Sequence, residues 1–138
     1  MTRTSRTILA DTSAWGELYR KTGSPIDLAL TQLLTDGSRL STTEPIFMEL
    51  LSARRPIGEL ARLRQRLLSL RMLRVGGLET FEQAAVIHRV CRSNGETIRS
   101  SIDCLIAAVA VREGASVLAA DNDFEAIARH TSLRLEPV

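Results

Sequence analysis

Short apolar segments alternate with helical patterns along the whole chain, and this alternation restricts the fold more than any other feature. Strand-like segments are expected at residues 7–10, 39–41, 72–75, 116–120 and 133–135. Helices are expected at residues 13–21, 25–36 (ending before Gly37), 46–53, 57–69, 79–93, 102–112 and 124–129. This alternation predicts an α/β fold with a mainly parallel central sheet flanked by helices. Because the sequence shows no repeat or linker, we expect one domain spanning residues 1–138.

The composition argues against secreted and membrane proteins. No apolar run approaches the roughly 18 residues that a membrane-spanning helix needs. The first residues lack the apolar core and the cleavage site of a signal peptide. The two cysteines, Cys91 and Cys104, are too few for a disulfide framework. We therefore expect a cytoplasmic protein with no membrane association.

The charged residues are distributed unevenly, although the formal net charge is only +2. Every basic residue except Lys21 is an arginine, and residues 54–74 hold seven arginines but a single acid, Glu59. This stretch, called the arginine segment below, therefore carries +6 and leaves −4 on the rest of the chain. A charge run is usually a solvated helix face, yet this one lacks the acids of an ordinary surface helix. Such a stretch could bind nucleic-acid phosphates.

Two carboxylates directly follow strand-like segments. Asp11 follows the first of these segments and Asp121 follows the fourth. In parallel α/β sheets, functional sites form at the carboxyl ends of strands. Helix capping explains either residue equally well. Asn122 and Glu125, however, have the spacing of a capping box, which places Asp123 in the first helical turn and leaves Asp121 less explained by structure than Asp123.

Two further carboxylates lie in strongly apolar helical patterns. Glu49 lies in a helix that is otherwise apolar nearly all round, and Asp103 is at the second position of another such helix. An unpaired buried carboxylate is costly. The simpler explanations are that Glu49 is solvated or pairs with Arg54 or Arg55, and that Asp103 complements the helix dipole.

Taken together, these four acids predict a metal site. Clustered carboxylates repel one another unless they are neutralised. A hard divalent cation, Mg²⁺ or Mn²⁺, neutralises an all-oxygen set most readily. The histidines and cysteines do not have the spacing of a zinc site.

Four blocks of the sequence carry a family resemblance. They are residues 11–13 (Asp-Thr-Ser), 47–51 (Phe-Met-Glu-Leu-Leu), 97–108 and 121–124 (Asp-Asn-Asp-Phe), of which the third is the most specific. In order and spacing they resemble the PIN-domain family, and more closely the VapC toxins of bacterial toxin–antitoxin pairs, over nearly the whole chain. The resemblance implies a PIN-like three-layer fold and a metal-dependent endoribonuclease that leaves 5′-phosphate and 3′-hydroxyl ends. It also implies a cognate VapB-like antitoxin and a homodimer.

The resemblance also implies roles for the acids. In that family four acids line the metal site, and the matching positions here are Asp11, Glu49, Asp103 and Asp121. We expect Asp11 and Asp103 to be the primary ligands, with Glu49 and Asp121 acting through water or positioning the nucleophile. Asp123 is an auxiliary candidate, and the choice between Asp121 and Asp123 as the fourth acid stays open.

Three more residues are candidates beside the acids. The hydroxyls of Thr12 and Ser13 would orient Asp11, although simple capping is an equally good explanation. Arg99 is expected to contact an RNA phosphate. The arginine segment would bind RNA, or equally the acidic or apolar tail of an antitoxin. With aromatic residues at 4%, we expect recognition of the shape and backbone of a folded RNA rather than base stacking.

Two alternative functions remain for comparison. A phosphotransfer protein would use Asp11 as acceptor, but Ser13 occupies the place of the second acid in an Asp-x-Asp start, and no lysine follows Lys21. A non-catalytic RNA- or protein-binding PIN-like module would not need the four acids. The identity of the RNA does not follow from the sequence.

Overall fold

The computed structural model describes residues 6–36 and 39–138, so the predicted helix end at Gly37 lies outside the described residues. The strands are β1 (Ile8–Ala10), β2 (Leu40–Thr42), β3 (Arg71–Met72), β4 (Ser116–Leu118) and β5 (Arg134–Leu135). The helices are α1 (Thr12–Tyr19), α2 (Pro25–Asp36), α3 (Glu44–Leu51), α4 (Ile57–Leu68), α5 (Leu78–Ser93), α6 (Ser101–Glu113) and α7 (Asn122–His130). The predicted α/β fold is confirmed.

The five described strands form one sheet in the order β3-β2-β1-β4-β5, and every pair is parallel. The chain moves from β1 toward β2 and β3 on one side, and later adds β4 and β5 on the other side. The order therefore reverses between β1 and β4, whose residues Ala10 and Leu118 are paired. A crevice outside the carboxyl ends of two such strands is where ligands bind in open α/β sheets.

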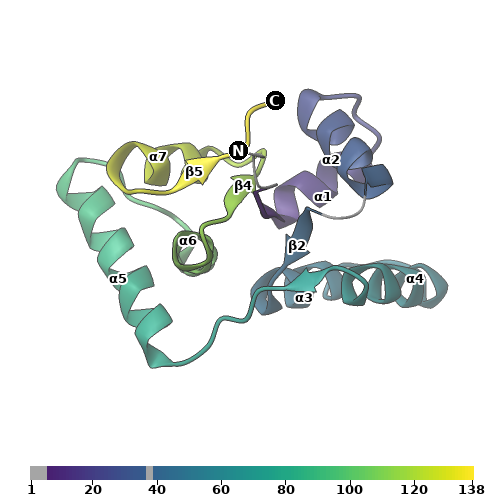
Figure 1. Cartoon of the computed structure of the whole chain (residues 1–138), viewed down its shortest axis with the longest axis horizontal. Coiled ribbons are helices and arrows are strands. Elements are labelled where there is room, and N and C mark those ends of the chain that lie inside the picture. The colour runs from purple at the N-terminus through teal and green to yellow at the C-terminus, as the bar shows by residue number, and fades with distance from the viewer. Residues whose placement is uncertain (1–5, 37–38) are drawn as a thin grey trace, which may run out of the picture.

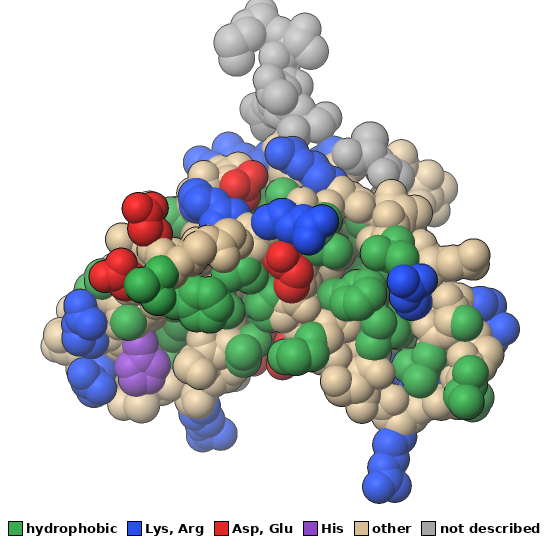
Figure 2. Space-filling model, turned by 90° about the horizontal axis from the view of Figure 1, so that it is seen from below, with side chains coloured by type: hydrophobic (Ala, Val, Ile, Leu, Met, Phe, Trp, Pro, Cys, Tyr) green, Lys and Arg blue, Asp and Glu red, His purple; other side chains and the backbone are tan. Residues whose placement is uncertain are grey.

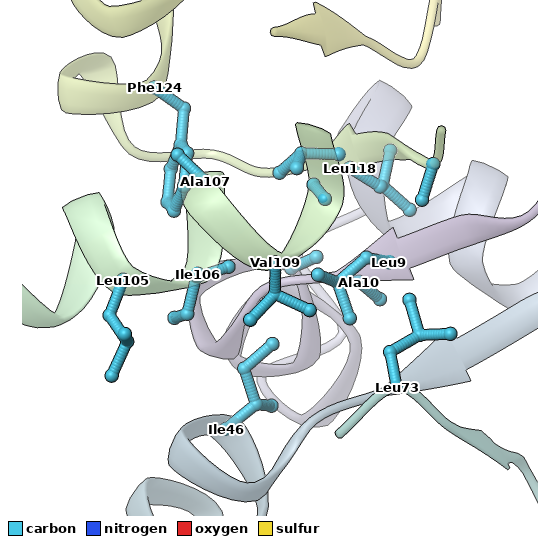
Figure 3. Packing of buried hydrophobic residues seen from close by; sticks show 14 of the residues in the cluster. Leu9, Ala10, Ile46, Leu73, Leu105, Ile106, Ala107, Val109, Leu118 and Phe124 are labelled. Atoms are coloured by element: carbon cyan, nitrogen blue, oxygen red, sulfur yellow. The ribbon is translucent and has the colours of Figure 1, made fainter. Parts of the chain in front are cut away.

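Helices cover both faces of the sheet. Figure 1 shows α1 and α2 on one side, and α6 backed by α5 on the other. Helix α6 is the central helix of the core, since residues 103–110 are all buried. In Figure 3, Val109 of α6 points toward Ile46 of α3, while Ala107 faces Phe124 of α7. The strongly apolar sequence of α6 thus reflects packing on several sides.

Helix α6 ends where its sequence predicts. Gly114 adopts a left-handed conformation with φ of 65°, and its N–H donates to the carbonyl groups of Ala110 and Val111. A side chain at this φ would be strained, whereas glycine adopts it freely. The chain can therefore turn directly into β4.

The middle of the arginine segment forms α4, an amphipathic helix rather than a uniformly charged one. In α4, Leu63 and Leu67 are buried, while the arginines of this helix are exposed. The helix is anchored by its leucines, and its charge remains available at the surface. Among the described helices, none is both long enough and apolar enough to span a lipid bilayer.

The predicted element boundaries are wrong by a few residues in places. The third strand covers Arg71–Met72 instead of residues 72–75, although Leu73 and Val75 are buried as an apolar strand pattern requires. The fourth strand ends at Leu118 instead of residue 120. Strand ends are set by pairing with the neighbouring strand, and apolar sequence alone does not specify where that pairing stops.

Candidate metal centre

The carboxyl ends of β1 and β4 bring two predicted acids to the reversal point of the sheet. Asp11 follows β1, and its N–H donates to the Leu118 carbonyl of β4 at 2.9 Å. Asp121 begins α7 three residues after β4. The strand pairing that builds the sheet therefore also brings the two acids to one edge.

Ser13 fixes the position of the Asp11 carboxylate. Its hydroxyl donates to Oδ2 of Asp11 at 2.7 Å and accepts from the N–H of Ala120 at 2.9 Å, and its own N–H donates to the same oxygen at 3.0 Å. This network links the end of β1 to the segment after β4. Asp11, and not Ser13, is the N-cap of α1.

Asp103 enters the same site from the first turn of α6. Ser100 caps this helix, so Asp103 is its third residue and not the second as predicted. Carboxylate oxygens of Asp103, Asp121 and Asp123 all lie within 4.8 Å of one another. Oδ2 of Asp103 is buried and accepts no hydrogen bond from any described residue. A buried carboxylate oxygen without a partner is costly, and a bound cation removes that cost.

Glu49 reaches the site from α3. Its Oε1 accepts a hydrogen bond of 2.7 Å from the Thr12 hydroxyl at the start of α1. Within the described residues, Glu49 forms no ion pair with Arg54 or Arg55, so the simpler explanation by arginine pairing is wrong. The helix turns Glu49 toward α1 because its apolar neighbours Ile46 and Leu50 face the core.

The acids perturb one another electrostatically. Burial raises the pKa of Asp103 to about 8, and contact with Asp121 and the charge of Asp11 act in the same direction. Burial also raises the pKa of Asp11, against the hydrogen bonds from Ser13, and the charge of Glu49 adds to the rise. The five acids therefore lie close enough to repel, although they arise from four separate segments of the chain. Such mutual repulsion is what a divalent cation relieves.

These residues fit a divalent cation by chemistry as well as by placement. The donor set consists of carboxylate oxygens, which suit Mg²⁺ or Mn²⁺. Within residues 6–36 and 39–138, Asp103, Asp121 and Asp123 form the group of acids close enough together to share one ion. The charge of Asp11 acts on Asp103, and the charge of Glu49 acts on Asp11. A hydrogen bond from Ser13 holds the Asp11 carboxylate, and one from Thr12 holds the Glu49 carboxylate.

The two alternatives for the fourth acid differ in their local bonding. Asp121, and not Asn122, is the N-cap of α7, and its Oδ1 accepts from the N–H of Asp123 at 2.9 Å. The predicted capping box headed by Asn122 is therefore wrong, and Asp121 has the capping role. A capping carboxylate has a second oxygen, so capping and metal binding are compatible at this residue. Both side chains are half-buried.

Arg99 lies just before α6 and is exposed. Within the described part of the chain it makes no hydrogen bond or ion pair. Ser100 is a positioning residue that the sequence analysis missed, although the pattern Ser-x-x-Asp at 100–103 is a capping signal. In Figure 2, acidic atoms are visible within a recess at the lower margin of the molecule, and basic side chains project on both sides of it.

Comparison with known proteins assigns the family. The PIN domain family matches residues 8–130. Ribonuclease VapC11 of Mycobacterium tuberculosis and a VapC ribonuclease of Mycobacterium bovis are each 43% identical over 128 residues, which cover 92% of this chain and 96% of the relative.

Solved structures share the fold at lower sequence identity. VapBC2 of Rickettsia felis, bound to a DNA fragment from its promoter, has a TM-score of 0.69 at 17% identity and covers 94% of this chain and 97% of that one. The Sarcin-Ricin loop cleaving toxin VapC20 of Mycobacterium tuberculosis has a TM-score of 0.64 at 22% identity, over 93% and 99% of the two chains. The length and identity of the match to the curated relatives establish that this chain belongs to the PIN-domain family, in the group of the VapC proteins.

Proposed function

We propose that this protein is a metal-dependent endoribonuclease toxin, which inhibits growth by hydrolysing RNA phosphodiester bonds and is neutralised by a cognate antitoxin. The observation that carries the proposal is the buried Asp103 carboxylate, whose Oδ2 has no partner among the described residues and which lies beside two further acids. The four acids that match the family pattern, Asp11, Glu49, Asp103 and Asp121, are all present and support catalysis. The curated relatives are named ribonucleases, which supports RNA as the substrate.

The contacts of the individual residues support a role for each of them. Asp103 and Asp121, with Asp123 beside them, would hold Mg²⁺ or Mn²⁺. The bound cation would supply an activated water and stabilise charge on the phosphate and the leaving oxygen. Ser13 keeps the Asp11 carboxylate oriented toward this centre by its two hydrogen bonds.

Glu49 is the candidate for positioning the attacking water. Its Oε1 is held by Thr12, and its second oxygen makes no hydrogen bond within the described residues. Glu49 is half-buried, so its side chain is partly accessible. Arg99, exposed before α6, would contact a phosphate of the substrate beside the metal.

Two protein partners are part of the proposal. A VapB-like antitoxin is supported by the related structures of VapBC complexes from Rickettsia felis and Salmonella typhimurium. A homodimer is supported by large apolar side chains exposed on α3 and α5, namely Met48, Leu78 and Phe81. Apolar side chains also gather on the face seen in Figure 2. We place the activity in the cytoplasm, where RNA is available and where the buried thiols of Cys91 and Cys104 would stay reduced.

The direct test is cleavage of RNA by the purified protein. Total RNA is incubated with the protein in Mg²⁺ or in EDTA, and the 5′-phosphate ends are sequenced. We expect discrete cleavage sites in Mg²⁺ that are absent in EDTA and absent with Asp103→Asn. Undiminished cleavage in EDTA would exclude a metal-dependent reaction. RNA binding without any cleavage would favour a non-catalytic binding module.

A further inference from the structure

A second concave site lies between α1 and α4, lined by residues outside the carboxylate cluster. The cavity of about 220 Å³ is lined by Tyr19, Arg55, Glu59, Arg62, Leu63 and Arg66. Three of these side chains are guanidinium groups and one is a carboxylate, so the lining carries a net positive charge. We call this cavity the arginine pocket.

An aromatic stack holds one of the guanidinium groups in place. The Arg55 guanidinium carbon lies 4.7 Å from the centre of the Tyr19 ring. The Tyr19 ring stacks in turn on the fully buried Trp15, with ring centres 6.3 Å apart and planes at 20°. A guanidinium resting on a fixed ring loses less freedom when it binds a ligand.

The guanidinium groups of the pocket have no acidic partner in the described structure. Neither Arg55 nor Arg62 nor Arg66 lies within 4.0 Å of a carboxylate oxygen of a described residue. Elsewhere in the arginine segment, Arg71 pairs with Glu113 and Arg74 with Glu44. Arg54 and Arg64 also lack an acidic partner among the described residues, but they lie outside the cavity. The pocket differs in that three guanidinium groups without such a partner line one cavity, which favours an anionic ligand there.

The pocket is connected to the carboxylate cluster by α1. Asp11 caps the start of this helix and Tyr19 is its last residue, so about 12 Å of helix separate them. Residues 49–55 contact both ends of α1: Glu49 contacts Thr12 at its start, and Arg55 contacts Tyr19 at its end. The two segments thus run side by side from the acids to the pocket. A few nucleotides of a single RNA strand can span this distance.

We propose that the arginine pocket is a subsite for a backbone phosphate of the RNA, a few nucleotides from the bond that is cleaved. The proposal rests on the ribonuclease function above. Planar guanidinium groups bind phosphate oxygens through paired, charge-assisted hydrogen bonds. The cavity of about 220 Å³ matches one ribose-phosphate unit and is too small to enclose a protein helix, which favours RNA over a helical segment of a protein partner.

The test compares two double variants that lose the same charge. Arg62→Gln/Arg66→Gln removes two guanidinium groups from the pocket, whereas Arg54→Gln/Arg64→Gln removes two exposed ones outside it. Binding of a fluorescent 12-nucleotide RNA of mixed sequence is measured by anisotropy, in EDTA and over a range of salt concentrations. Circular dichroism checks that both variants are folded.

We expect the pocket variant to bind roughly tenfold more weakly, because charged hydrogen bonds are lost. The slope of log K against log salt should also fall by about 0.7, the value for one phosphate contact on a single strand. The control variant removes arginines of the same segment that lie outside the pocket, and it should lose much less affinity and less of the slope. Tyr19→Phe should bind normally, and Tyr19→Leu, which removes the ring beneath Arg55, should weaken binding.

Two results would overturn the subsite. Equal losses in both double variants would mean that the positive charge acts diffusely. Unchanged RNA binding, with a synthetic acidic peptide bound by the wild type and lost only in the pocket variant, would assign the pocket to a protein partner. Neither result would affect RNA cleavage by the wild type in Mg²⁺. If the proposed ribonuclease function were wrong, the wild type itself would not cleave RNA.

Discussion

The Thr12 hydroxyl donates a 2.7 Å hydrogen bond to Oε1 of Glu49, and this bond joins the start of α1 to α3 beside the acid cluster. Thr12 immediately follows Asp11, so the bond places Glu49 next to the residue that caps α1. The contact links two residues that are 37 positions apart in sequence. It gives Thr12 a role that a simple helix cap would not have.

Removing this hydrogen bond should reduce activity without unfolding the protein. Thr12→Val keeps the shape of the side chain but leaves Glu49 free to turn. We expect kcat/KM for RNA cleavage to fall about tenfold, equivalent to about 1.4 kcal/mol. Thr12→Ser retains the donor and should stay close to the wild type. A loss of activity in Thr12→Ser with none in Thr12→Val would show that the methyl group, and not the bond, matters.

The raised pKa of Asp103 predicts an unusual pH dependence of stability in the metal-free protein. With a folded pKa of about 8 against an ordinary value of 3.8, the folded protein keeps a proton that the unfolded chain releases. The free energy of unfolding therefore falls as the pH rises from about 4 to about 8. In EDTA, Asp103→Asn should raise the melting temperature at pH 8 and change it little at pH 4. A melting temperature at pH 8 that is lower for Asp103→Asn than for the wild type would contradict the raised pKa of Asp103.

Asp121 should show two separable contributions, because it both caps α7 and faces the acid cluster. Asn caps a helix as well as Asp does. Asp121→Asn should therefore lose metal binding while keeping its stability. Asp121→Ala should lose metal binding and also about 1 kcal/mol of stability, as judged by urea unfolding. Comparable stability in the two variants would show that the cap contributes little.

The hydrogen bonds that Glu96 accepts should stabilise the segment that carries Arg99. The Glu96 carboxylate accepts from Arg129 and His130 at the end of α7. The bond from Arg129, followed by that from His130, holds the pKa of Glu96 below its ordinary value. Its stabilising effect is thus present above the ordinary pKa and is lost as the pH falls through the lowered one. Glu96→Gln should lower the melting temperature at pH 7, with a smaller difference near pH 3.

The sequence identifies the acids because each one is anomalous in its local setting. Asp11 and Asp121 follow apolar strands, while Glu49 and Asp103 interrupt apolar helices, and those settings alone place them in the interior or at strand ends. Their gathering into one site depends on the parallel order of the sheet, which the alternation of strands and helices predicts. Their individual metal-binding roles remain predictions.

The caps and the partners are harder to predict than the acids. Ser13, Ser101 and Asn122 are as good N-caps by composition as Asp11, Ser100 and Asp121, the residues that cap the helices in the structure. The choice between them depends on where the preceding strand or loop meets the helix, which is a tertiary property. The contact of Arg55 with Tyr19 likewise joins segments far apart in sequence, and no local pattern indicates it.

The most direct test of the account is whether the acid cluster binds a divalent cation through Asp103. Mn²⁺ binding is measured by titration calorimetry and electron paramagnetic resonance for the wild type, Asp103→Asn and Asp36→Asn, the last removing an exposed acid of α2. We predict that the wild type and Asp36→Asn bind Mn²⁺ with the same affinity, with proton release at pH 7, and that Asp103→Asn loses this binding. Equal Mn²⁺ affinity in all three proteins would contradict the metal centre.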